Sequence, residues 1–388
     1  MKDSTAAIRN QMERSQYREH STPMFMTSSF VYDSAEHAEA MFAGEAEGYI
    51  YSRFSNPNVS ELITKMCALE GTESGVATAS GMAAVFNTMA ALLEAGDHVV
   101  AAKSLFGNSS YILQHILPKW GIETTLVEID DIQAWENAFT PKTKLVLIET
   151  PTNPGLGLID MKWLADLTHQ HNALLVVDNC FATPILQKPI EYGADLILHS
   201  ATKWIDGQGR VLGGMVLGGN EAIMAVYDFI RRTGAALSPF NAWILSKSLE
   251  TLEVRMDRHC SNALTIAKEL ESHPNIEKLI YPFLASHPQY DLAKKQMTAG
   301  GGIITIELKK GKAEAFKFIN ALKLPSVTAN LGDARTIITH PSTTTHSKLS
   351  KEDQIAAGIT QSTIRVSVGL ESASDLLEDF HHALNAMI

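Results

Sequence analysis

The sequence predicts an α/β protein of two domains, and two observations support this prediction. Between residues 58 and 248, short apolar runs alternate with segments of helical periodicity. Runs that are apolar throughout are typical of strands buried on both faces of a mainly parallel sheet. The second observation is the length, because 388 residues exceed what one small hydrophobic core organises. We therefore expect a large sheet domain and a smaller second domain.

The N-terminal part of the chain differs from the rest. Residues 1–57 are polar and irregular, with Pro23 and the turn sequence Asn56-Pro57-Asn58, so we expect an extended arm with one or two helices. Domain 58–248 then contains seven short apolar runs, which predict a seven-stranded, mainly parallel sheet. These runs are 75–79, 99–102, 124–127, 145–148, 174–177, 196–198 and 215–217.

The C-terminal part of the chain mixes both periodicities. A long helical pattern over about 239–272 is expected to lead from the sheet into the second domain, 249–388. This mixture indicates a smaller α+β domain. Its predicted strands are 303–308, 336–338 and 364–368, and its predicted helices are 313–322 and 374–387.

The composition is that of a soluble globular protein, with 45% hydrophobic and 19% charged residues. The formal net charge of −11 argues against a nucleic acid or an anionic membrane as partner. No apolar stretch is long enough to span a bilayer, and the first residues lack the apolar core of a signal peptide. Cys67, Cys180 and Cys260 are widely separated, which is typical of reduced thiols and predicts a cytoplasmic protein.

A lysine and an aspartate each follow a predicted strand. Lys203 follows an apolar strand within His199-Ser200-Ala201-Thr202-Lys203, and Asp178 ends the run 173–177. A lysine in this place is poorly explained as a solubilising surface charge. An amine and a carboxylate together are the minimum set for pyridoxal 5'-phosphate (PLP), since the amine forms a Schiff base with the aldehyde and the acid keeps the pyridine nitrogen protonated.

The segment Ser80-Gly81-Met82 lies between a predicted strand and a helix predicted over 83–93. Backbone N–H groups at a helix N-terminus bind phosphate, and a glycine there allows close approach. Many α/β turns carry Ser-Gly without binding phosphate, so an ordinary turn is the alternative. Ser200 and Thr202 precede Lys203 by three residues and one, and their hydroxyls favour the phosphate site.

Three further segments carry polar groups suited to anion recognition. Arg53 lies beside Tyr51 in a polar loop, where a surface turn is the alternative. Asn153 lies between two prolines after a buried strand, at the sheet edge where α/β folds bind ligands. Arg365 stands within the alternating strand 363–368. It either faces solvent or serves as a fixed clamp for a carboxylate.

Taken together, these segments resemble the Cys/Met-metabolism family of PLP-dependent enzymes, whose members are fold-type I transferases. The resemblance covers residues 51–371 in the family's order, nearly the whole chain. The segments that carry it are Tyr51-Ser52-Arg53, Ser80-Gly81-Met82, Glu149-Thr150-Pro151-Thr152-Asn153-Pro154, Asp178-Asn179, Ser200-Ala201-Thr202-Lys203 and Arg365-Val366-Ser367-Val368-Gly369.

The resemblance implies a role for each matching residue. Lys203 matches the catalytic lysine that binds the cofactor, and Asp178 matches the acid paired with the pyridine nitrogen. The residues that match phosphate ligands are Gly81, Met82, Ser200 and Thr202. The residues that match the clamp for the substrate α-carboxylate are Asn153 and Arg365.

The resemblance also implies a homo-oligomer. Tyr51, a second catalytic candidate, and Arg53 match residues that reach the phosphate of the neighbouring subunit, so the arm 1–57 would complete a neighbouring site. The expected assembly is a tetramer built from dimers that share active sites. Phe106 falls where many relatives have a tyrosine stacked on the cofactor ring. A phenylalanine keeps the stacking, and any proton transfer by the missing hydroxyl would fall to Lys203, Tyr51 or water.

Two segments, 206–214 and 330–346, resemble the O-succinylhomoserine sulfhydrylase branch of the family. That branch implies a γ-replacement in methionine biosynthesis, from O-succinylhomoserine and sulfide to homocysteine and succinate. The alternatives are cystathionine γ-synthase or O-acetylhomoserine sulfhydrylase, then a lyase, and last a PLP-binding protein without catalysis. The cysteine associated with methionine γ-lyase is absent, because Asn108 follows Phe106-Gly107.

Arg210 is a candidate contact for the distal carboxylate of the succinyl group. The alternative is a salt bridge that fixes its own loop. His340 and His346 are residues of a type that binds metal ions, but no cysteine or aspartate pattern accompanies them, so no metal site is predicted.

Overall fold

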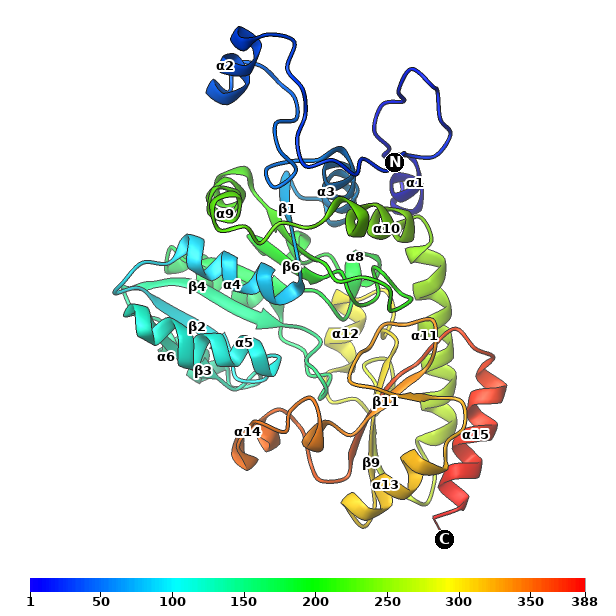
Figure 1. Ribbon diagram of the computed structural model, residues 1–388. Coiled ribbons are helices and arrows are strands. Elements are labelled where there is room, and N and C mark those ends of the chain that lie inside the picture. Colours follow the sequence, from blue (N-terminus) through cyan, green and yellow to red (C-terminus); the bar gives the residue numbers. More distant parts are fainter. Residues whose placement is uncertain (388) are drawn as a thin grey trace.

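The computed structural model describes residues 1–387, and its large sheet confirms the predicted α/β fold (Figure 1). The sheet has seven strands in the order β1-β7-β6-β5-β4-β2-β3. Strand β7 runs antiparallel to β1 and β6, whereas the pairs from β6 across to β3 are parallel. Each strand begins and ends within two residues of its predicted run. The strands are β1 (Ser74–Thr78), β2 (His98–Ala102), β3 (Glu123–Val127), β4 (Thr143–Glu149), β5 (Leu174–Asp178), β6 (Leu196–Ser200) and β7 (Gly214–Gly218).

Helices cover both faces of this sheet, as continuous apolar strands require. Helices α4 and α9 pack on one face, and α3, α6 and α7 pack on the other. The helices of this part are α3 (Pro57–Glu70), α4 (Gly81–Leu92), α5 (Gly107–Tyr111), α6 (Ile132–Ala138), α7 (Met161–Gln170), α8 (Thr183–Leu186), α9 (Asn220–Thr233) and α10 (Pro239–Leu249). A π-helical turn spans Ile112–Ile116, and 3-10 turns span Leu117–Trp120 and Pro189–Tyr192.

A second, five-stranded sheet follows in the order β10-β11-β12-β9-β8. It is antiparallel except for the pair β10 and β11. Its strands are β8 (Ile276–Ile280), β9 (Ile303–Leu308), β10 (Ser326–Val327), β11 (Ile337–Thr339) and β12 (Thr363–Ser367). The accompanying helices are α11 (Leu252–Leu270), α12 (Tyr290–Gln296), α13 (Lys312–Ala321), α14 (Lys351–Ala356) and α15 (Ala373–Asn385), with a 3-10 turn at Pro341–Thr343.

Two details of the C-terminal prediction were wrong. The single helical pattern over 239–272 forms two helices, α10 and α11, because Thr251 leaves the helical region with φ −118° and ψ 7°. The N–H of Thr251 bonds to the carbonyl of Ser248, which turns the chain there. Strands β8 and β10 were missed because both lie at sheet edges and carry exposed residues. Edge strands are commonly short and polar, so they lack a continuous apolar run.

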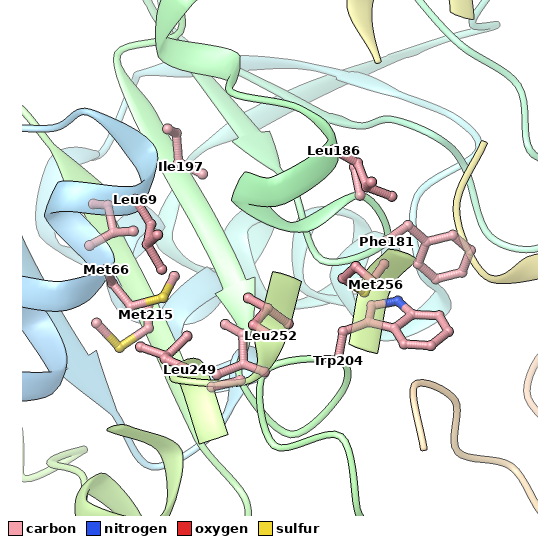
Figure 2. Close-up of a cluster of buried hydrophobic side chains, with 14 of the residues drawn as sticks. Met66, Leu69, Phe181, Leu186, Ile197, Trp204, Met215, Leu249, Leu252 and Met256 are labelled. Atoms are coloured by element: carbon pink, nitrogen blue, oxygen red, sulfur yellow. The ribbon is translucent and has the colours of Figure 1, made fainter. Parts of the chain in front are cut away.

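A buried apolar cluster joins the two sheet regions (Figure 2). Met66 and Leu69 from α3 meet Met215 from the large sheet, and Leu252 and Met256 from α11 complete the cluster. Trp204, directly after Lys203, is fully buried in the same cluster. The segment that carries Lys203 is therefore anchored by core packing.

The N-terminal arm contains α1 (Asp3–Arg9) and α2 (Ala35–Ala43), in agreement with the predicted one or two helices. In Figure 1, α2 projects away from the two sheets. Several large apolar side chains of this part are exposed, with Val31 98% exposed and Tyr17 and Phe42 also largely exposed. The division into an arm 1–57 and domains 58–248 and 249–388 remains a proposal.

Candidate active site

A cavity of about 440 Å³ lies where β4, β5 and β6 end and α4 begins. Ligands of open α/β sheets bind at this edge, beyond the carboxyl ends of the strands. The predicted site residues that line the cavity are Gly81, Met82, Phe106, Asn153, Asp178, Ser200, Thr202, Lys203 and Arg365. The fold thus brings together nine residues that are scattered over almost 290 positions of the sequence.

Lys203 lies in the turn after β6, where its N–H donates to the carbonyl of Ser200. Its Nζ donates to Oδ1 of Asn330 at 2.5 Å. Burial lowers the pKa of Lys203, and the positive charge of Arg365 lowers it further, against an opposing effect of Cys180. A lowered pKa favours the neutral amine, which is the form that attacks an aldehyde or accepts a proton.

Asp178 is the last residue of β5 and pairs in register with Glu149, the last residue of β4. Oδ1 of Asp178 accepts a hydrogen bond of 3.0 Å from the N–H of Cys180. Burial raises the pKa of Asp178, whereas that hydrogen bond and the charge of His199 lower it. A carboxylate at this place suits a ligand that brings a compensating cation, such as a protonated pyridine ring.

The first turn of α4 forms a cradle against the end of β6. The Ser80 hydroxyl caps the helix by accepting from the N–H of Ala83 at 3.1 Å. A Cβ on Gly81 would lie 2.6 Å from Cβ of Ser200, so only glycine permits this approach. The Thr202 hydroxyl is held by the backbone of Gly213 at 3.2 Å and 3.3 Å. Helix N–H groups and hydroxyls in this arrangement fit a phosphate group.

Arg365 projects from β12 into the cavity and is 2% exposed, which excludes the solvent-facing alternative. It donates to Oδ1 of Asn153 at 3.0 Å and to the carbonyls of Asn330 and Ala329 at 2.9 Å and 3.2 Å. Burial lowers the pKa of Arg365 to about 10, and Glu149 partly opposes this. A buried guanidinium beside an amide is suited to holding a carboxylate.

Phe106 lines the cavity just before α5, and its N–H donates to Oε2 of Glu149 at 2.9 Å. Glu149 itself and Asn330 were not selected as site residues from the sequence. Glu149 belongs to one of the motifs, and its position directly after a predicted strand, like that of Asp178, was the signal available in the sequence. No local sequence signal pointed to Asn330, because its contact with Lys203 spans 127 positions.

Tyr51 and Arg53 do not line this cavity. Tyr51 is 40% exposed, and the guanidinium of Arg53 lies over the rings of Tyr51 and Phe54. Arg53 instead lines a separate cavity of about 220 Å³ near Arg231. Their predicted role toward a neighbouring subunit remains a proposal.

Arg210 also lies outside the residues that line the cavity. Its Nε donates to Oδ1 of the buried Asp206 at 3.1 Å, and a second guanidinium nitrogen donates to the Ser248 hydroxyl at 2.5 Å. The structure therefore places Arg210 in the salt bridge that was its alternative role. Within residues 1–387, no group of three or more His, Cys, Asp or Glu side chains could hold a metal ion, and no helix is long and apolar enough to cross a membrane.

The chain is similar to known proteins over almost its whole length. The family model for Cys/Met metabolism PLP-dependent enzymes matches residues 4–385. The chain is 45% identical to an O-succinylhomoserine sulfhydrylase from Pseudomonas aeruginosa, over 99% of this chain and 95% of that protein. It is 42% identical to an L-methionine γ-lyase from Porphyromonas gingivalis, over 95% and 93% of the two chains.

A solved structure is also similar over nearly the whole chain. It is that of a putative O-acetylhomoserine (thiol)-lyase from Campylobacter jejuni, with a TM-score of 0.96 and 32% identity over 99% of this chain and all of that one. That crystal structure contains a pyridoxyl-lysine monophosphate. The cradle of α4, the acid at the end of β5 and the amine after β6 fit the same group here.

Proposed function

The chain belongs to the family of PLP-dependent enzymes of Cys/Met metabolism, and from this premise we propose that it is an O-succinylhomoserine sulfhydrylase. The reaction would be a γ-replacement that converts O-succinylhomoserine and sulfide to homocysteine and succinate. The observation that carries the proposal is which segments of the chain line the cavity. Leu212, Leu331 and Thr345 line the cavity, and they come from the two segments that resemble this branch of the family.

The cofactor, when bound, stabilises negative charge at the Cα of an attached amino acid. The α4 N-terminus with Ser200 and Thr202 would hold its phosphate, and Lys203 would hold its aldehyde carbon. Asp178 in its ionised form would keep a proton on the pyridine nitrogen, because an adjacent negative charge favours the cationic ring.

The substrate's α-carboxylate would bind between Arg365 and Asn153, which already contact each other. This fixes the Cα–H bond relative to the Nζ of Lys203, a contribution of orientation to the rate. Nζ then accepts the Cα proton as a neutral amine, a form that burial favours. Phe106 cannot donate or accept a proton. Lys203 would therefore have to pass the Cα proton on to the bound cofactor before its amine, neutral again, could accept the second proton, which leaves Cβ before the γ-ester departs.

The distal succinyl carboxylate requires a cation that this cavity does not offer. Among the residues that the structure describes, the cationic side chains that line it are Lys203 and Arg365, and both have other tasks. We propose that Tyr51 and Arg53 from the arm of a neighbouring subunit reach the cofactor phosphate in this site, since both lie outside the cavity of their own chain. The active form would then be a homo-oligomer in the cytoplasm, a tetramer built from dimers that share active sites.

An O-acetylhomoserine sulfhydrylase is the second candidate, because the absence of a cation for a second carboxylate in the cavity suits an uncharged acyl group. Cystathionine γ-synthase would take cysteine in place of sulfide, and a lyase would take no nucleophile other than water. Asn108, which lines the cavity, occupies the place of the cysteine associated with methionine γ-lyase.

One experiment separates these candidates. The purified enzyme is offered O-succinyl- or O-acetylhomoserine, each with sulfide or cysteine, and the thiol or thioether product is identified. We expect homocysteine from the succinyl ester and sulfide at the highest kcat/KM of the four pairings. A higher kcat/KM with the acetyl ester would select the second candidate, and 2-oxobutanoate from methionine alone would select the lyase.

A further inference from the structure

Glu149 is a buried acid of the cavity to which neither the family resemblance nor the proposed reaction gives a task. It is 4% exposed and lines the cavity beside Asp178, its register partner on the neighbouring strand. Register partners on adjacent parallel strands point to the same face of the sheet. Two carboxyl groups therefore lie side by side beneath the space that the cofactor ring must occupy.

The surroundings of Glu149 do not support a negative charge. Within residues 1–387 it has no salt bridge, and the two terminal nitrogens of Arg365 donate instead to the Asn153 amide and to two backbone carbonyls. Burial raises the pKa of Glu149 well above its usual range, and Asp178 raises it further, while the Phe106 N–H and Arg365 act in the opposite direction. A second anion beside Asp178 would be costly in this enclosed place.

The hydrogen bond that Glu149 makes is structural in kind. Its Oε2 accepts the N–H of Phe106 at 2.9 Å, and Phe106 is the aromatic residue expected to stack on the ring. This hydrogen bond spans 43 positions of the sequence and connects the end of β4 to the loop before α5. Asp178, the acid expected at the ring nitrogen, ends β5, and the backbone of Phe106 is tied to Glu149 at the end of the neighbouring strand β4.

We propose that Glu149 is a positioning residue for the cofactor ring, which acts as a neutral carboxyl group that ties the Phe106 backbone to the sheet. Its neutrality leaves Asp178 as the anion beneath the ring nitrogen. The charged and titratable groups that face it are Asp178, Arg365, Lys203 and Cys180. The proposal requires the cofactor but not the proposed substrate, so it holds for any of the candidate reactions.

The test compares three variants of the holoenzyme by cofactor affinity and by visible circular dichroism of the cofactor band, which reports how the ring is held. Glu149→Gln keeps the acceptor and the neutral charge, so the dissociation constant is expected within about two-fold of the parent, with an unchanged dichroic band. Glu149→Ala leaves the Phe106 N–H without its partner, and affinity should fall roughly ten-fold, with a weaker band. Glu149→Asp keeps the acid but is one methylene too short for the contact, and it should resemble Glu149→Ala.

The outcomes that overturn the proposal are specific. If Glu149→Gln behaves as Glu149→Ala does, the residue acts as an ion, and if Glu149→Ala leaves both readouts unchanged, it positions nothing. Glu307→Gln is the matched control, since Glu307 is a half-buried acid on β9 whose pKa burial also raises, outside the cavity. Thermal unfolding of each variant shows whether the protein is still folded. For the folded protein, the visible dichroic band of the cofactor then decides between the outcomes.

Discussion

The two sides of the cavity come from different sheets and differ in how they hold charge. On the large-sheet side, Asp178 ends β5 and Lys203 lies in the turn after β6, next to Trp204 of the buried core. On the small-sheet side, Arg365 belongs to a strand, and its guanidinium is held at the cavity by hydrogen bonds to Asn153 and to the segment 329–330. We therefore expect that cofactor binding and substrate binding can be impaired independently. Variants on the large-sheet side should affect the first, and variants on the small-sheet side the second.

The largest effect is expected on the large-sheet side. Lys203→Ala removes the amine that we propose holds the cofactor and moves the proton, so turnover should fall at least about a thousand-fold. The visible absorption band of covalently held cofactor should disappear in the same variant. Borohydride reduction followed by peptide mass spectrometry checks this, and a pyridoxyl group found on another lysine would contradict the assignment.

A clear contrast is expected for Arg365→Ala on the small-sheet side. The substrate carboxylate loses its charged clamp, and kcat/KM should fall about a hundred-fold, mainly through KM. The cofactor band should stay close to that of the parent, because Arg365 contacts none of the predicted phosphate ligands. Arg335→Ala is the control, since Arg335 is an exposed arginine of the same domain that pairs with Asp333. A lost cofactor band in Arg365→Ala would show that the two sides are not separable.

The reverse pattern is expected for Gly81→Ala. The added Cβ would lie 2.6 Å from Ser200 Cβ, so the cradle must open and cofactor affinity should fall roughly ten-fold. With cofactor in excess, the KM for the amino-acid substrate should remain that of the parent. Spectroscopic titration of the cofactor checks the first expectation, and steady-state kinetics checks the second. Gly107→Ala is a suitable control, because a Cβ there meets nothing within 4 Å.

The stability of the protein should depend on pH through His259, which connects the two sides. This buried histidine of α11 packs on Trp204, next to Lys203, and bonds to the Val368 carbonyl after β12 at 2.7 Å. Burial lowers the pKa of His259 to about 4. Because the unfolded chain binds the proton near pH 6.5, stability is present above that pH and is lost as the pH falls toward 4.

Between pH 7 and pH 5 this histidine should reduce the free energy of unfolding by about 2 kcal/mol. Denaturant unfolding at both pH values measures the change. His259→Asn, which keeps a donor for the Val368 carbonyl, should have a flatter pH dependence by that amount. An equal slope in both proteins would show that His259 does not titrate between the two states.

The smallest catalytic effect is expected for Arg210→Ala. Its guanidinium is held by Asp206 and Ser248 rather than directed into the cavity, so KM should change by less than about three-fold, equally for succinyl and acetyl esters. Stability should fall slightly, because the buried Asp206 loses a partner. A KM that rises selectively for the succinyl ester would return Arg210 to the substrate site.

Much of the large-sheet side could be predicted from the sequence. Strands buried on both faces are apolar throughout, so their ends, and with them Asp178, Lys203 and the turn at Gly81, are visible as breaks in composition. The small-sheet side was harder to predict. Its edge strands β8 and β10 lack such runs, and whether Arg365 faces solvent or the cavity could not be decided from an alternating pattern.

From the sequence we could predict the α/β class, the cofactor and most of the residues that line the cavity, because local apolar periodicity and short motifs record which residues end a strand or begin a helix. Only the tertiary structure decided which side chains share one enclosure. It placed Arg365 inside, Arg210 in a salt bridge, and Glu149 and Asn330 next to the catalytic groups. The contacts of Arg365, Glu149 and Asn330 span 35 to 212 positions of the chain, and burial shared between distant segments leaves no local trace in the sequence.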